Sequence, residues 1–138
     1  MRRLVLDTSV LLSAFVGAPT SPPGRLLAAA RAGAFEIAAC PLIFEELRRG
    51  LSKPYFSARV RESEAVELLD ALGLLAVVAP DPVSPTSVLR DPTDDFLVAL
   101  AIATGVDAIV TSDRDLLDHA GLRPPAINAR AACELLGI

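Results

Sequence analysis

Short apolar runs alternate along the chain with longer segments in which apolar residues recur every three or four positions. The short runs predict buried strands, and the longer segments predict helices with one or more buried faces. The expected strands span Leu4–Leu6, Phe35–Ala38, Leu75–Ala79, Ala108–Thr111 and Ala126–Ile127. The expected helices span Val10–Phe15, Thr20–Ala32, Pro41–Leu51, Ala58–Leu72, Asp91–Gly105, Asp113–His119 and the C-terminal residues, with a Pro-rich loop over Asp81–Ser87. This alternation predicts an α/β fold with a mostly parallel sheet of four or five strands.

The composition favours a globular protein over a disordered or membrane-spanning one. With 138 residues, 52% of them hydrophobic and 22% charged, the chain suits one compact domain over residues 1–138 with its own core. Its longest apolar stretch, residues 96–106, is about half as long as the roughly 20 residues that a membrane span needs. Asp7 interrupts the first apolar run after three residues, which argues against a signal peptide. We therefore expect a cytoplasmic protein without membrane association.

The cysteines and the histidine do not predict a zinc site. Cys40 and Cys133 stand outside any Cys-x-x-Cys pair, and His119 is the only histidine of the chain. We expect both cysteines to be reduced thiols in or near the core.

The basic residues gather in one segment although the net charge is −4. Five of them fall between residues 48 and 61, and four are candidates for holding a nucleic-acid backbone, because arginine forks bind phosphate well. The four candidates are Arg48, Arg49, Lys53 and Arg59. A solvated helix face explains the same pattern, so the cluster alone does not decide between the two interpretations.

Two aspartates directly follow predicted strands. Asp7 ends the strand in LVLDTS, and Asp113 follows the strand in AIVTSD. Ligands of open parallel sheets bind beyond the carboxyl ends of the strands, so both side chains stand where a ligand would be held. Each aspartate could instead cap the helix or turn that follows it.

Two further carboxylates stand at buried positions of predicted helices. At 100° per residue, Glu46 falls between two apolar neighbours at the buried edge of its helix, whereas Glu45 points to solvent. In RDPTDDFLVAL, Asp91 and Asp94 are explained as a cap and a first-turn acid of the next helix. Asp95 lies one step further in, on a helix that is apolar nearly all round. A buried carboxylate at either position needs a partner.

The four carboxylates are expected to meet at one edge of the sheet, because parallel strands end on the same side. Four converging negative charges repel one another unless a cation neutralises them. Ligation by oxygen alone suits Mg²⁺ or Mn²⁺ better than zinc. Such an ion activates water and stabilises charge on a phosphoryl oxygen, as hydrolysis of a phosphodiester requires.

Three segments together resemble the PIN-domain family, and specifically the VapC-like toxins of toxin–antitoxin pairs. They are LVLDTSVLLSAF, CPLIFEELRRGLSKP and DPTDDFLVALAIATGVDAIVTSDRDLL, which follow one another in the family's order between residues 4 and 117. Carried over by position, the resemblance implies that Asp7, Glu46, Asp95 and Asp113 are the catalytic acids, and that Asp7, Asp95 and Asp113 bind the metal. Ser9, Thr111 and Asp115 match auxiliary positions; many members have Asn or Ser at the position of Ser9.

The resemblance also implies a fold, an activity and partners. The expected fold is a three-layer α/β/α sandwich with a central, mostly parallel sheet. The expected activity is Mg²⁺- or Mn²⁺-dependent cleavage of RNA, with homodimer formation and a small antitoxin as partners. Two rivals stay open on the sequence: a phosphatase or receiver domain phosphorylated on Asp7, disfavoured because Lys53 is the only lysine, and a catalytically silent PIN-fold module for RNA binding or assembly.

Overall fold

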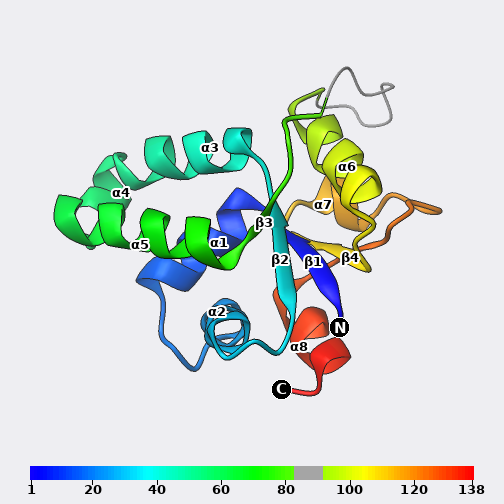
Figure 1. The fold of residues 1–138 in the computed structure, drawn as a ribbon, viewed down its shortest axis with the longest axis horizontal. Helices are drawn as coiled ribbons and strands as arrows, with labels where there is room; N and C mark the ends of the chain where they lie inside the picture. The colour runs from blue at the N-terminus through cyan, green and yellow to red at the C-terminus, as the bar shows by residue number, and fades with distance from the viewer. Residues whose placement is uncertain (83–91) are drawn as a thin grey trace.

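The fold consists of five strands and eight helices in the part of the chain that the computed structural model describes, residues 1–82 and 92–138, without the side chains of residues 92–95 (Figure 1). The strands are β1 (Arg3–Leu6), β2 (Glu36–Ala39), β3 (Val77–Val78), β4 (Ala108–Val110) and β5 (Ala126–Ile127). The helices are α1 (Thr8–Val16), α2 (Pro22–Arg31), α3 (Pro41–Leu51), α4 (Pro54–Ser57), α5 (Glu62–Leu75), α6 (Pro92–Thr104), α7 (Arg114–Leu117) and α8 (Ala129–Leu136). The predicted α/β class is confirmed.

All described strands run parallel in one sheet, in the order β3-β2-β1-β4-β5. Val5 of β1 pairs with Ala38 on one side and with Ile109 on the other. These strands read as continuous apolar runs because helices cover both faces of a parallel sheet.

The direction in which the chain crosses the sheet changes next to β1. From β1 the chain moves outward through β2 to β3, and it then returns through α6 to β4 on the other side of β1. Right-handed crossovers place α1 to α5 on one face and α6 and α7 on the other, as Figure 1 shows. The crevice between the carboxyl ends of β1 and β4 is therefore the topological switch point, where open α/β sheets bind ligands.

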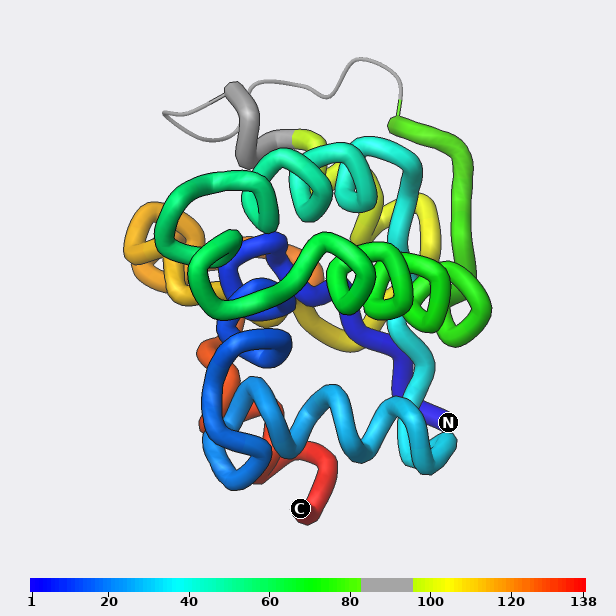
Figure 2. The backbone as a smooth tube through the Cα atoms, turned by 90° about the vertical axis from the view of Figure 1, so that its left-hand side faces the viewer, coloured from blue at the N-terminus to red at the C-terminus, as the bar shows by residue number. Residues whose placement is uncertain are grey.

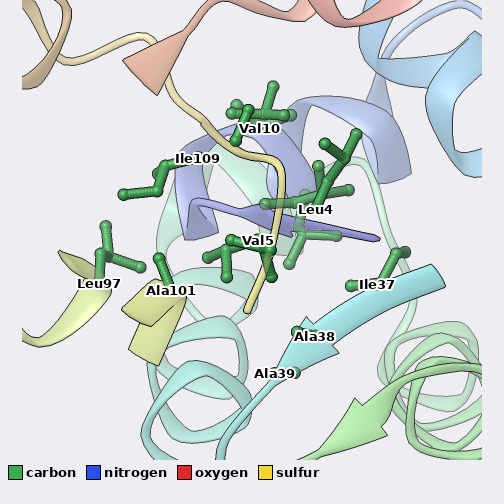
Figure 3. Close-up of a cluster of buried hydrophobic side chains, with 14 of the residues drawn as sticks. Leu4, Val5, Val10, Ile37, Ala38, Ala39, Leu97, Ala101 and Ile109 are labelled. Carbon is green, nitrogen blue, oxygen red and sulfur yellow. The ribbon is translucent and has the colours of Figure 1, made fainter. Parts of the chain in front are cut away.

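The core lies on both faces of β1, β2 and β4 (Figure 3). Leu4 and Val5 are fully buried, as are Ile37, Leu100 and Ile109. Burying one such side chain contributes about 1.5–3 kcal/mol, so these central strands anchor the loops that leave their ends. No helix in the described ranges is long and apolar enough to cross a membrane.

Helix α3 begins with Pro41 at its first position, directly after β2, so its amino end lies at the carboxyl edge of the sheet. Its N-cap residue, Cys40, makes no side-chain cap hydrogen bond. The Asp81 carboxylate, which follows β3, accepts a hydrogen bond from the Leu42 amide instead, at 2.9 Å. A residue 39 positions away thus satisfies a backbone donor at the amino end of α3.

Helices α1 and α3 approach each other closely at Gly50. A β-carbon built on Gly50 would lie 2.8 Å from a terminal carbon of Leu12, so any larger residue forces a shift. Gly50 lies one turn after Glu46 on the same helix. The missing side chain therefore lets α3 bring Glu46 toward the start of α1.

The amino edge of the sheet is held by a network around Arg3. Its guanidinium donates to the Thr104 carbonyl at 2.9 Å and to the Glu36 carboxylate at 3.1 and 3.3 Å. Its backbone amide donates to the Asp107 carboxylate at 2.9 Å. These bonds join β1, β2 and the turn between α6 and β4, and they pair the carboxylates of this edge with donors.

The boundaries differ from the sequence expectation around the third strand and the helix before it. Pro54 begins a separate four-residue helix, α4, so α5 starts at Glu62 rather than at Ala58. Helix α5 then continues to Leu75, which leaves only two residues for β3. The predicted Pro-rich loop lies outside the described residues from position 83 onward, as does Asp91.

Candidate active site at the carboxyl edge of the sheet

Asp7 connects β1 to α1, and its backbone and its side chain form hydrogen bonds with different parts of the chain. Its amide donates to the Val110 carbonyl at 2.8 Å, and its carbonyl accepts from Val10 and Leu11 at 3.0 and 3.1 Å. Although Asp7 is the N-cap residue of α1, its carboxylate makes no cap hydrogen bond. That carboxylate accepts a hydrogen bond from the Thr111 hydroxyl at 2.7 Å instead. The partner closest to this carboxylate is therefore a hydroxyl that follows β4, and not only the amides at the start of α1.

Thr111 joins the ends of β1 and β4. It is fully buried, and it is the only buried polar side chain among the residues that the structure describes. Its Oγ1 donates to Asp7 and accepts the Asp113 amide at 3.0 Å. The Asp113 carboxylate accepts the Asp115 amide at 2.9 Å and so caps α7. Thr111 thus fixes both aspartates at the switch point.

The protonation of Asp7 is perturbed by its surroundings. Burial raises the pKa of the Asp7 carboxyl above its ordinary value of 3.8, and the nearby charge of Asp113 raises it further. The hydrogen bond from Thr111 and the backbone amides of Thr8 and Ser9 lower the pKa but do not cancel the rise. Within the described ranges, no arginine or lysine forms an ion pair with Asp7 or Asp113. A bound cation would relieve this electrostatic cost.

Glu46 reaches the same edge from α3. It is half-buried, and its carboxylate accepts a hydrogen bond from the Thr8 hydroxyl at 2.9 Å. The neighbouring Glu45 is exposed and pairs with Arg48 at 2.6 Å and with Arg49 at 3.9 Å. The hydrogen bond from Arg48 lowers the pKa of the Glu45 carboxyl. The expected difference in burial between the two glutamates is confirmed.

The side chain of Asp95 lies outside the described residues, and only its place on α6 is given. Helix α6 leads into β4, which runs parallel to β1, so the amino end of α6 lies toward the carboxyl edge of the sheet. Asp95 belongs to the first turn of α6. The side chains described elsewhere in the chain form no group of three or more His, Cys, Asp or Glu residues that could hold a metal ion.

Hydroxyl groups surround the acidic residues, and sequence reasoning missed two of them. Ser9, an expected auxiliary residue, lies 3.2 Å from Ser112 between their hydroxyl oxygens. The two that were missed are Thr8 and Ser112, whose hydroxyls meet their partners only through contacts between distant segments. Asp115, also expected, is exposed and contributes its backbone amide to Asp113.

The four candidate cations separate into two groups. Arg49 and Lys53 line a depression of about 330 Å³ together with Thr8 and Glu46, between α1 and α3. Arg48 forms an ion pair with Glu45, and the guanidinium of Arg59 lies over the ring of Tyr55. Two of the four therefore border the acidic edge.

Comparisons with known proteins agree with this architecture. The family model described as the PIN domain matches residues 3–115, so the chain belongs to the PIN-domain family. It is similar in structure to VapBC2 from Rickettsia felis bound to a DNA fragment from their promoter, with a TM-score of 0.61 and 17% identity over 91% of this chain and 98% of that one. PAE2754 from Pyrobaculum aerophilum gives a TM-score of 0.64 and 20% identity over 99% of this chain and 90% of that one. No curated protein matches the chain.

At these identities the two structures establish the shared fold and nothing finer. The resemblance to the PIN-domain family and the three-layer α/β/α architecture, both expected from the sequence, are confirmed.

Proposed function

We propose that this chain is a metal-dependent endoribonuclease of the VapC type. The observation that carries the proposal is the chain of hydrogen bonds from Asp7 through Thr111 to Asp113 at the switch point. It ties the Asp7 carboxylate to the backbone of Asp113, and the pKa of the Asp7 carboxyl is raised without an ion pair to a cation of the described residues. Such an arrangement costs folding free energy and is maintained where a functional ion balances it.

The donor set fits a hard divalent ion. Asp7 and Asp113 offer carboxylate oxygens, and Asp95 is proposed as the third ligand because the first turn of α6 lies toward this edge. Oxygen ligands favour Mg²⁺ or Mn²⁺, which supply a polarised water and stabilise charge on a phosphoryl oxygen. Glu46, held by Thr8, would orient the attacking water or accept its proton.

The substrate side of the proposal rests on the depression beside Glu46. Arg49 and Lys53 border it, so the phosphates of an RNA strand could lie between α1 and α3 with the acids at one end. Binding through these cations would weaken as the salt concentration rises. Arg48 and Arg59 do not line this depression.

The assembly state and the partner are also proposals. A VapC-type nuclease would form a homodimer in the cytoplasm and be restrained by a small antitoxin protein. The similarity of the fold to VapBC2, which was crystallised with promoter DNA, supports looking for such a partner. Size-exclusion chromatography with light scattering would test the dimer.

The decisive experiment measures cleavage of a mixed RNA pool by the purified protein with Mg²⁺ or Mn²⁺ and with EDTA. Asp113→Asn should remove the metal-dependent cleavage. Asp118→Asn is the matched control, because Asp118 is exposed at the other end of α7 and pairs with Arg114 at 3.3 Å. Asp95→Asn should also lower the metal-dependent cleavage if Asp95, which is assigned from its position on α6, is the third metal ligand.

Cleavage that survives EDTA or Asp113→Asn would refute the proposal. RNA binding without cleavage under any metal condition would favour the catalytically silent module instead.

A further inference from the structure

An exposed aromatic ring on α4 is covered by a cation. Tyr55 is 57% exposed, and the guanidinium carbon of Arg59 lies 3.7 Å from the centre of its ring. Arg59 also donates to the Tyr55 carbonyl at 2.7 Å. The two side chains therefore form an exposed cation–π pair.

Packing does not explain why an aromatic residue stands at this position. Phe56, the next residue, is half-buried and contacts Tyr55 edge-on, with ring centres 4.9 Å apart. Phe56 is therefore the less exposed of the two aromatic residues of α4, while Tyr55 stays outside. Arg59 forms no ion pair within the described ranges, so its charge is available to a ligand.

The position of this surface relative to the acidic edge is set by α3. Lys53, the N-cap residue of α4, lines the depression that contains Glu46, and Tyr55 follows two residues later. Lys53 lies seven positions after Glu46 and two residues beyond the end of α3 at Leu51. Figures 1 and 2 show that α4 connects the carboxyl end of α3 to the start of α5. An RNA strand whose phosphates contact Arg49 and then Lys53 would therefore extend from the acidic residues toward α4.

We propose that Tyr55 and Arg59 form a stacking subsite for an unpaired base of the RNA substrate. Aromatic rings stack on any base, and a guanidinium plane adds a cation–π contribution. Bases in a duplex already stack on each other, so the subsite selects single-stranded RNA. This inference rests on the proposed nuclease function, because it assigns a substrate class to the same site.

The chain provides its own spectroscopic probe of this subsite. Tyr55 is its only tyrosine and it has no tryptophan, so intrinsic fluorescence reports on this ring alone. A short single-stranded RNA, titrated into the Asp7→Asn protein to prevent cleavage, should quench the fluorescence. An abasic oligonucleotide of the same length carries the same phosphates and should not. Equal quenching by both would overturn the proposal.

Affinity measurements supply a second readout. Tyr55→Leu should weaken binding of a labelled single-stranded RNA by about 5-fold to 100-fold, the range for loss of one stacked base. Tyr55→Phe keeps the ring and should bind like the unmodified chain, while circular dichroism checks that both variants fold. Unchanged affinity in Tyr55→Leu, or equally tight Tyr55-dependent binding of duplex RNA, would refute the subsite.

The two proposals fail in different ways. Metal-dependent cleavage with an unchanged KM in Tyr55→Leu would leave the nuclease standing and remove the stacking subsite. Base-dependent quenching by a protein that never cleaves RNA would support the subsite and refute the nuclease.

Discussion

The two edges of the sheet use the same kinds of side chain in opposite ways. At the amino edge, the Glu36 and Asp107 carboxylates accept hydrogen bonds from Arg3, which ties three elements together. At the carboxyl edge, Asp7 and Asp113 share Thr111 and form no ion pair within the described ranges. The first edge is satisfied internally, whereas the second retains a negative charge that an outside cation can balance.

The difference shows how structural and functional acids can be told apart in one fold. A carboxylate that serves stability, such as Glu36, forms an ion pair with a cation of the chain, and a mutation there costs folding free energy. A carboxylate kept for a ligand carries an electrostatic cost, and its removal can stabilise the chain. The predictions below test this contrast, beginning with the largest expected effect.

Asp7→Asn should lower metal-dependent cleavage by about 100-fold to 1000-fold, the equivalent of several kcal/mol of transition-state stabilisation. The same change should raise the Tm at neutral pH in EDTA. Between 3.8 and its higher folded-state pKa, Asp7 binds more protons in the folded state, so stability falls as pH rises through that interval. Asparagine removes this cost because it cannot ionise.

Thermal melts with and without Mn²⁺ provide the control for Asp7→Asn. The ion should raise the Tm of the unmodified protein and leave that of the variant nearly unchanged. A variant that melts lower than the unmodified protein in EDTA would contradict the contrast between the two edges.

Arg3→Met, at the amino edge, should lower the stability of the fold and leave cleavage unchanged. Methionine keeps an apolar stem but loses the donors to Thr104 and Glu36, which costs about 1–2 kcal/mol of unfolding free energy. Denaturant titration measures the loss. Cleavage per folded molecule should be unchanged, and a large drop in kcat would show that the two edges are not independent.

Thr8→Val should lower kcat about 10-fold with a smaller change in KM, because the Thr8 hydroxyl positions the Glu46 carboxylate. Valine has nearly the same shape and lacks the hydroxyl, and Thr8→Ser should restore activity. A merely structural role for Thr8 would instead lower the Tm and leave the pH profile of kcat in place.

The smallest effect is expected at Glu45, which serves as the matched control for its neighbour. Glu45→Gln removes an exposed pair with Arg48 and should change cleavage by less than about two-fold. Glu46→Gln should lower cleavage by about 10-fold or more. Equal effects in parallel rate measurements would remove the distinction between the two residues.

Periodicity and strand ends were enough to predict the parallel sheet and the proximity of two candidate residues. Asp7 and Asp113 follow apolar strands, and parallel strands end on the same side, so their proximity follows from the pattern alone. Glu46 was separated from Glu45 by its angle on a helix. These are local rules, and they apply before any tertiary contact is known.

Contacts between distant segments could not be predicted in this way. The bond from Thr8 to Glu46 spans 38 residues and depends on how α1 packs on α3. Leu42, one of the apolar residues of α3, is 38% exposed, because an angle on an isolated helix does not show where the neighbouring helices end. Arg59 was grouped with the other cations by sequence distance, although its guanidinium lies over Tyr55.

The close approach of Gly50 to Leu12 has a consequence for the record of substitutions in related chains. The two positions share one small volume, so a methyl group gained at position 50 requires the end of the Leu12 side chain to move away or to be shortened. Homologues should therefore combine glycine at 50 with leucine at 12, or alanine at 50 with a smaller residue at 12, and rarely two large residues. Covariation of positions 12 and 50 would then keep the distance between α1 and α3 constant in homologues whose other positions have diverged.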